Sequence, residues 1–187
     1  MNILDIFINS IQLIITLDQE LWDIIFLSLY VSFTALIIAS ILGFLIGYYL
    51  ALHNFFLKKI LLVLLNSLMG IPPVVVGLIV YFIFASGGPL GVLQLLYTPS
   101  AMIIAQTIII FPIIVSLSHE IFSKNWFEFK DQIRSLNIPF LGSAKLLFNH
   151  SYFLLITTLL SAFGRAISEV GAVMIVGGNI DQYTRVM

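Results

Sequence analysis

Long apolar stretches alternate with short polar ones along this chain. The stretch over 24–52 carries no charged residue and is long enough to cross a bilayer as a tilted helix. Three further stretches, 60–85, 99–118 and 151–176, are almost as apolar. The pattern therefore predicts an all-α integral membrane protein with four spans. Pro99 should open the third span at its first turn, where a missing N–H costs least.

The N-terminal stretch 1–20 is shorter and more polar than a span, because Asp5, Asn9 and Gln12 interrupt its apolar residues. It also lacks the basic region and the small-residue cleavage site of a signal peptide. We therefore expect an interfacial amphipathic helix here, with the membrane domain following over 21–187.

The first and second spans contain residues that shape helix packing. Gly43 and Gly47 have a G-x-x-x-G spacing, which either lets another helix approach closely or is a chance occurrence. Pro72 and Pro73 lack the backbone N–H and disfavour helix just before them, so the second span should open at membrane depth. Broken backbone there must be covered by protein or line a water-filled cavity. The kink either lines a translocation path or serves packing alone.

Composition agrees with lipid as the main solvent of this chain. Of its 187 residues, 60% are hydrophobic and only 9% are charged, whereas a soluble domain carries about 25% charged residues. The net charge of −1 gives no electrostatic basis for binding nucleic acid. Cysteine is absent, which excludes disulfides and thiolate metal sites.

The basic residues predict an orientation. Six of the eight lysines and arginines lie in two loops, 53–59 and 119–150, which four spans place on the same side. The positive-inside rule makes this side cytoplasmic. The N-terminus then lies outside, together with the connector 86–98, which has no basic residue. Thr184 and Arg185 are also expected outside, within reach of a substrate or a partner.

Arg165 and Glu169 are the two charges inside the fourth span, and their spacing of four allows an ion pair on one helix face. A charge at membrane depth is costly and usually marks function. Three interpretations stay open: a gate or subunit contact, a direct anion ligand at Arg165, and a structural ion pair at a helix end. The first and third are favoured over direct ligation, because Glu169 would cancel the charge of Arg165.

Three sequence motifs carry a family resemblance. Residues 131–138 read DQIRSLNI, residues 70–77 read GIPPVVVG and residues 164–172 read GRAISEVGA. The first resembles the E-A-A-x-x-x-G motif in the coupling segment of ABC importer permeases. The other two resemble the L-P-P-V-V-x-G and A-R-x-x-G-E-F-G-A segments of molybdate and tungstate permeases. Ser168 and Val170 look more like the tungstate branch.

This resemblance implies a type I, MetI-like transmembrane domain over 21–187, with its coupling segment at about 126–147. The chain would be the permease subunit of an ATP-driven, binding-protein-dependent importer of an oxyanion, tungstate first and molybdate or sulfate as alternatives. Implied partners are a second copy in a homodimer, cytoplasmic ATP-binding subunits, an extracytoplasmic substrate-binding protein and lipid, in the cytoplasmic (inner) membrane of a bacterium. Such permeases have a fifth span, so we expect a C-terminal truncation at Met187.

In the coupling segment, Asp131 stands for the acid of the motif and Asn137 for its glycine. The glycine position should need φ above zero, and Asn tolerates this better than most residues. Gln132, Arg134 and Ile138 complete the predicted contact with the ATP-binding subunits.

Large apolar side chains surround the coupling segment. They suit either the core of a protein–protein contact or a loop with aromatics at headgroup level, and the resemblance favours the contact. These side chains are Trp126, Phe127, Phe129, Phe140, Leu141, Leu146, Leu147 and Phe148.

The predicted pathway and gate draw on the second and fourth spans. The residues are Gly70, Pro72, Pro73, Gly77, Arg165, Glu169 and Gly171.

Two other classes of protein were weighed against an ABC permease. A stand-alone secondary transporter needs intramembrane acids for a proton or sodium relay, and only Glu169 qualifies. A membrane-embedded enzyme needs clustered histidines or acids at membrane depth, which the sequence does not provide. No G-x-x-x-x-G-K-[ST] phosphate loop occurs either, so ATP hydrolysis would belong to a separate subunit. No cofactor or metal is predicted.

Overall fold

The computed structural model describes residues 19–181 and 183–186, and across them the chain is helical with no strand. The all-α prediction is confirmed for this part of the chain. The predicted interfacial segment 1–20 lies outside the described residues except for Gln19 and Glu20. These two residues form the first turn of α2, so the helix begins earlier than the predicted first span.

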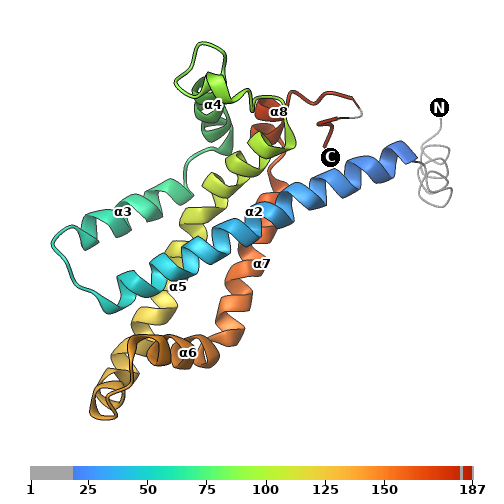
Figure 1. Cartoon of the computed structure of the whole chain (residues 1–187). Coiled ribbons are helices and arrows are strands. Elements are labelled where there is room, and N and C mark those ends of the chain that lie inside the picture. Colours follow the sequence, from blue (N-terminus) through green and yellow to red (C-terminus); the bar gives the residue numbers. More distant parts are fainter. Residues whose placement is uncertain (1–18, 182, 187) are drawn as a thin grey trace.

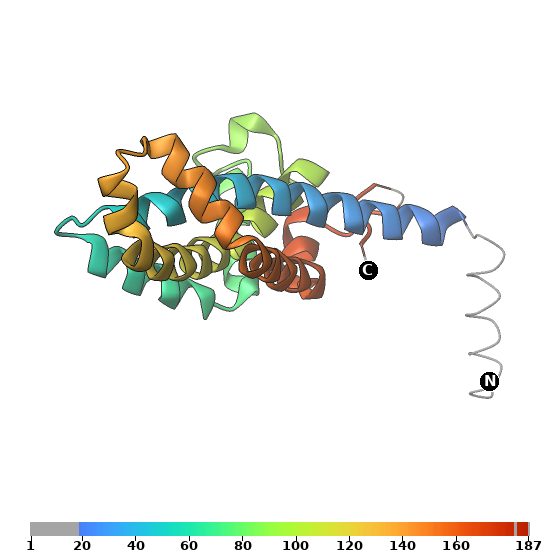
Figure 2. The ribbon, with the colours of Figure 1, turned by 90° about the horizontal axis from the view of Figure 1, so that it is seen from below.

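Two long helices, α2 (Gln19–Leu52) and α5 (Pro99–Ser135), pack side by side along the middle of the molecule (Figure 1). The G-x-x-x-G spacing explains the closeness of their contact. A Cβ at Gly43 would lie 2.7 Å from Ile114 Cγ2, and one at Gly47 would lie 2.1 Å from Ser118 Oγ. The packing interpretation of these glycines is therefore confirmed. Figure 2 shows that the first turns of α2 extend beyond the other helices.

The second apolar stretch is broken into α3 (Lys58–Met69) and α4 (Pro73–Phe84), whose axes differ by 102°. Pro72 precedes α4 in an extended conformation and Pro73 is its first residue. Both positions suit proline, because the first turn of a helix leaves its N–H groups without intrahelical partners. The predicted opening at the double proline is confirmed. A short 3-10 turn, η1 (Gly91–Leu93), lies in the connector to α5.

The third span starts at Pro99 as predicted, and the Thr98 hydroxyl caps it by accepting a hydrogen bond from the Ala101 N–H. The helix then continues to Ser135 instead of ending near Ser118. The predicted polar loop 119–150 is therefore largely helical. It consists of the end of α5, a turn, and α6 (Phe140–His150).

The fourth predicted span is also divided, into α7 (Tyr152–Ser168) and α8 (Gly171–Gly177), which two non-helical residues separate. Before it, α6 meets α7 at an angle of 74°. The prediction of one helix over 151–176 is therefore wrong. The break falls at Glu169, which has extended backbone angles of φ −99° and ψ 90°.

Two helices, α2 and α5, are long and apolar enough to cross a membrane among the described residues. The number rises to four only if the bent pairs α3–α4 and α6–α7 each count as one span, although α6 belongs to the predicted loop 119–150 and not to the predicted fourth span. With 34 residues, α2 is about 51 Å long. This length exceeds the hydrocarbon core of a bilayer, about 30 Å thick.

Candidate functional site

The basic residues gather at one end of the helix bundle. The Tyr48 hydroxyl, near the end of α2, lies 2.9 Å from Ser143 Oγ in α6. Leu52 lines the same cavity as Trp126 of α5. The loop after α2 and the segment 119–150 therefore lie at the same end of the bundle, as a common side for the two basic stretches requires. This end carries six of the eight lysines and arginines.

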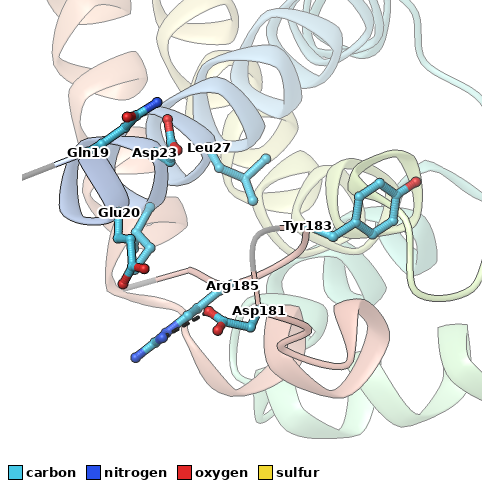
Figure 3. Close-up of a pocket in the computed structure, with 8 residues that line it drawn as sticks. Gln19, Glu20, Asp23, Leu27, Asp181, Tyr183 and Arg185 are labelled. Carbon is cyan, nitrogen blue, oxygen red and sulfur yellow. Dashed lines mark hydrogen bonds and ion pairs between the residues drawn. The ribbon is translucent and has the colours of Figure 1, made fainter.

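The opposite end is acidic. Figure 3 shows a cavity of about 600 Å³ between the start of α2 and the C-terminal segment, lined by Glu20, Asp23, Asp181 and Arg185 among others. The Arg185 guanidinium donates to the Asp181 carboxylate at 3.0 Å. Thr184 is fully buried and its hydroxyl donates to the Gly177 carbonyl. Arg185 thus lines the cavity, whereas the Thr184 side chain is buried and bonds within the local turn.

The turn between α5 and α6 has the backbone that its motif predicts. Asn137 has φ of 48°, which confirms the predicted left-handed position. The Ile138 N–H donates to the Ile133 carbonyl at 3.0 Å and closes the turn. Asp131, Gln132 and Arg134 are exposed around it. The motif therefore forms an exposed helix-turn-helix corner that a partner can contact.

A groove of about 490 Å³ runs beside this corner. Its lining combines apolar side chains with the polar side chains of Arg134, Asn137 and Ser143. The lining residues are Leu52, Trp126, Ile133, Arg134, Asn137, Ile138, Phe140 and Ser143.

The large apolar side chains near the corner divide into two groups. One group points inward and packs on Tyr48 and Phe122, and Leu147 in it is completely buried. The inward group is Trp126, Phe129, Leu147 and Phe148. The other group is exposed: Phe127, Phe140, Leu141 and Leu146. Four of the eight side chains therefore pack within this chain, and only Leu147 among them is fully buried. The partner contact stays a prediction.

The helix break at the double proline borders a cavity of about 340 Å³. Ile71 of the break and Val76 of α4 line this cavity, together with Arg165 of α7 and Thr107 of α5. The remaining lining residues are apolar: Leu42, Leu65, Leu68, Met69, Ile108, Ile109, Phe111 and Pro112. The structure therefore brings Arg165 to the same cavity as Ile71 of the break, although the two residues lie far apart in the sequence.

Gly77 and Gly171 belong to a different contact, where α4 packs on α8. A Cβ at Gly77 would lie 2.8 Å from the Ala172 Cα, and one at Gly171 would lie 3.1 Å from Val74 Cγ2. These glycines bring two backbones close together. The close approach of α4 and α8 is thus established, while the predicted pathway role of the two glycines stays a prediction.

Glu169 lies away from Arg165. It lines a separate cavity of about 180 Å³ between α2, α5 and α8, together with Gln106 and Ser32. The only ion pair among the described residues joins Arg185 to Asp181. The predicted Arg165–Glu169 pair is wrong, because α7 ends at Ser168 and the helical spacing of the two residues is lost.

Gln106 is a buried polar residue that sequence reasoning missed. Its side chain is 4% exposed, and Nε2 donates to the Ala166 carbonyl at 3.0 Å. Oε1 has no hydrogen-bond partner among the described residues. The signal in the sequence was a lone amide in the most apolar part of the third span. Within the described residues, no cluster of three histidines or acids is arranged to hold a metal.

Comparison with known proteins gives several relatives along most of the chain. The tungstate uptake system permease protein TupB of Peptoclostridium acidaminophilum is 40% identical over 178 residues, which are 95% of this chain and 78% of the relative. The TupB protein of Campylobacter jejuni is 34% identical over 184 residues, covering 98% and 77%. A probable anion ABC transporter permease protein of Haloferax volcanii is 39% identical over 153 residues, covering 82% and 66%. No family model matches the chain.

Proposed function

Because the chain belongs to the family of ABC transporter permeases that includes the tungstate uptake permeases, we propose that it forms the membrane path of an ATP-driven tungstate importer. It is an integral membrane protein and a permease component. The observation that carries the tungstate assignment is the 40% identity to a tungstate permease over 95% of the chain. Molybdate and sulfate are the alternative cargoes.

The working complex contains three kinds of protein contact. Two copies of the chain form a closed dimer, which is the common outcome for identical subunits. ATP-binding subunits sit on the cytoplasmic side and a substrate-binding protein docks outside. The fold is of the MetI-like type, in the cytoplasmic membrane of a bacterium, with the N-terminus outside. Alternation between outward and inward states is then a population shift driven by differential binding of nucleotide and partner.

The corner between α5 and α6 is the docking surface for the ATP-binding subunits. Asp131, Gln132, Arg134 and Asn137 are exposed there, and Phe127 and Leu141 are 76% and 80% exposed. Exposed apolar groups within a polar rim suit a protein contact. The inward group packs on Tyr48 of α2 and therefore connects this corner to the first span. A displacement of α6 by the ATP-binding subunits is then transmitted to the membrane-spanning helices.

The break at Gly70–Pro73 lines the translocation path. It opens the backbone next to a cavity, which is where broken backbone is tolerated in a membrane. The α4–α8 contact at Gly77 and Gly171 holds the break in place, and the α7–α8 junction at Glu169 serves as the hinge of the gate.

Reconstitution tests the function. Purified chain, ATP-binding subunit and binding protein are placed in liposomes, and uptake of labelled tungstate is followed with and without ATP. We expect uptake only with all three proteins and ATP, with molybdate and sulfate competing less well than unlabelled tungstate. Uptake by the chain alone would favour the secondary transporter instead. Preferential competition by molybdate or sulfate would change the cargo but keep the class.

Cysteine labelling tests the orientation, because the native chain contains no cysteine. Lys130→Cys should react with an impermeant thiol reagent only from the cytoplasmic side. Gly87→Cys, in the connector 86–98, is the matched control and should react only from outside. Labelling of Lys130→Cys from outside would overturn the docking surface.

A further inference from the structure

Arg165 is the only basic residue within the four apolar stretches of the sequence. A charge at membrane depth is retained when it has a partner or a function. The sequence alone offers Glu169 as this partner. The structure removes it, since Glu169 lies beyond the end of α7 and lines another cavity.

Among the residues that the structure describes, no acid lines the cavity beside Arg165 and could neutralise the guanidinium. Thr107 is the only other polar residue in its lining, and its hydroxyl donates to the Ile103 carbonyl at 2.7 Å. An uncompensated guanidinium among apolar side chains is costly. The guanidinium carries five N–H donors in a planar fork that matches the oxygens of an oxyanion. An anion in this cavity would therefore supply what Arg165 lacks.

The size of the cavity agrees with such a ligand. Its volume is about 340 Å³, while one water takes up about 30 Å³ of liquid. A tetrahedral oxyanion fits together with several waters. The second cavity differs in chemistry, because the Gln106 Oε1 and the Glu169 carboxylate present acceptors and would repel an anion.

We propose that Arg165 is a transient binding site for the oxyanion cargo, placed where α3 and α4 separate. This inference rests on the proposed function and names a cargo-binding residue in its path. One guanidinium in a cavity otherwise lined by apolar groups holds the anion weakly. Weak binding suits transport, because the ion must be able to leave the site.

The test uses Thr107→Cys as a reporter inside the cavity of the cysteine-free chain, in the assembled importer in liposomes. The rate of its reaction with a small thiosulfonate reagent is measured at increasing tungstate concentrations. Tungstate should slow the reaction when Arg165 is present. In Arg165→Gln, the concentration for half-protection should rise at least about tenfold, since a charge-assisted hydrogen bond is lost. Arg165→Lys should keep part of the protection.

Lys59→Gln is the matched control, because it removes one positive charge from an exposed position outside the cavity. It should leave the half-protection concentration unchanged. Equal protection in Arg165 and Arg165→Gln importers would overturn the proposal. Loss of assembly in both Arg165 variants would also overturn it, since Arg165 would then serve a subunit contact. Tungstate uptake by the unsubstituted importer is measured in parallel, and failure there would reject the proposed function separately.

Discussion

Two breaks interrupt the apolar helices of this protein, and they differ in origin. The α3–α4 break contains Pro72 and Pro73, which remove backbone donors and turn the chain by 102°. The α7–α8 break contains no proline and falls at Glu169 and Val170. The first break follows from the missing backbone N–H groups of its two prolines. The second depends on where α8 packs, and it moves Glu169 away from Arg165. Helix breaks in membrane proteins can therefore place charges as well as bend helices.

The largest effect should come from removing the first break. The double variant Pro72→Ala and Pro73→Ala restores two backbone donors and lets α3 and α4 join, since an interior proline disfavours a helix by about 3 kcal/mol. We expect tungstate uptake to be lost in the liposome assay, while the protein still folds and assembles. Pro89→Ala, in the exposed connector, should retain uptake. Full uptake by the double variant would mean that the break is not required.

The stability of the protein should depend strongly on the packing of α4 against α8, next to the first break. Gly77→Ala places a Cβ 2.8 Å from the Ala172 Cα, and overpacking of this kind costs about 1–3 kcal/mol. We expect a lower thermal unfolding temperature in detergent. Gly164→Ala is the matched control, because a Cβ there meets no atom within 4 Å. It should raise stability by up to about 1 kcal/mol through helix propensity. The comparison fails if both variants shift stability in the same direction.

Substitutions at Asn137 test whether the docking corner depends on the left-handed backbone of this one residue. Its φ of 48° is poorly tolerated by β-branched residues. Asn137→Val should destabilise the corner by about 1–2 kcal/mol, whereas Asn137→Gly should not. The measurement is ATPase stimulation by substrate in the assembled importer, together with thermal unfolding. Equal behaviour of the two variants would show that the left-handed backbone is not what this position contributes.

Gln106 should matter less to stability than its burial implies. Gln106→Leu loses the hydrogen bond to Ala166 but also removes the unpaired Oε1. The two effects oppose each other, each on the order of 1 kcal/mol. We expect the free energy of unfolding to change by less than about 1 kcal/mol. A much larger loss would indicate that the amide holds more than the Ala166 carbonyl.

The smallest effect concerns the second break. Glu169→Gln should leave tungstate protection of the Thr107→Cys reporter unchanged, because the carboxylate lines the other cavity. If it tightened the apparent affinity for tungstate, Glu169 and Arg165 would be electrostatically coupled. That result would contradict the conclusion that Glu169 and Arg165 do not interact.

Motifs with a local backbone meaning were predicted correctly from the sequence. The proline break, the positive φ at Asn137 and the close approach at Gly43 and Gly47 each follow from what one or two residue types permit. Predictions that relied on a helix continuing were less successful. The Arg165–Glu169 pair assumed an unbroken fourth span, whereas α7 ends at Ser168.

By itself, then, the sequence determined that this chain is an integral membrane protein, that its basic residues gather at one end, and where prolines and glycines shape the backbone. These features depend on composition and on short-range sterics, which neighbouring residues decide. Only the tertiary structure decided that Arg165 faces the α3–α4 break without a carboxylate, while Glu169 joins Gln106 elsewhere. The physical reason is that burial and charge pairing depend on which distant helices meet, and α2, α5 and α7 each contribute lining residues to both cavities.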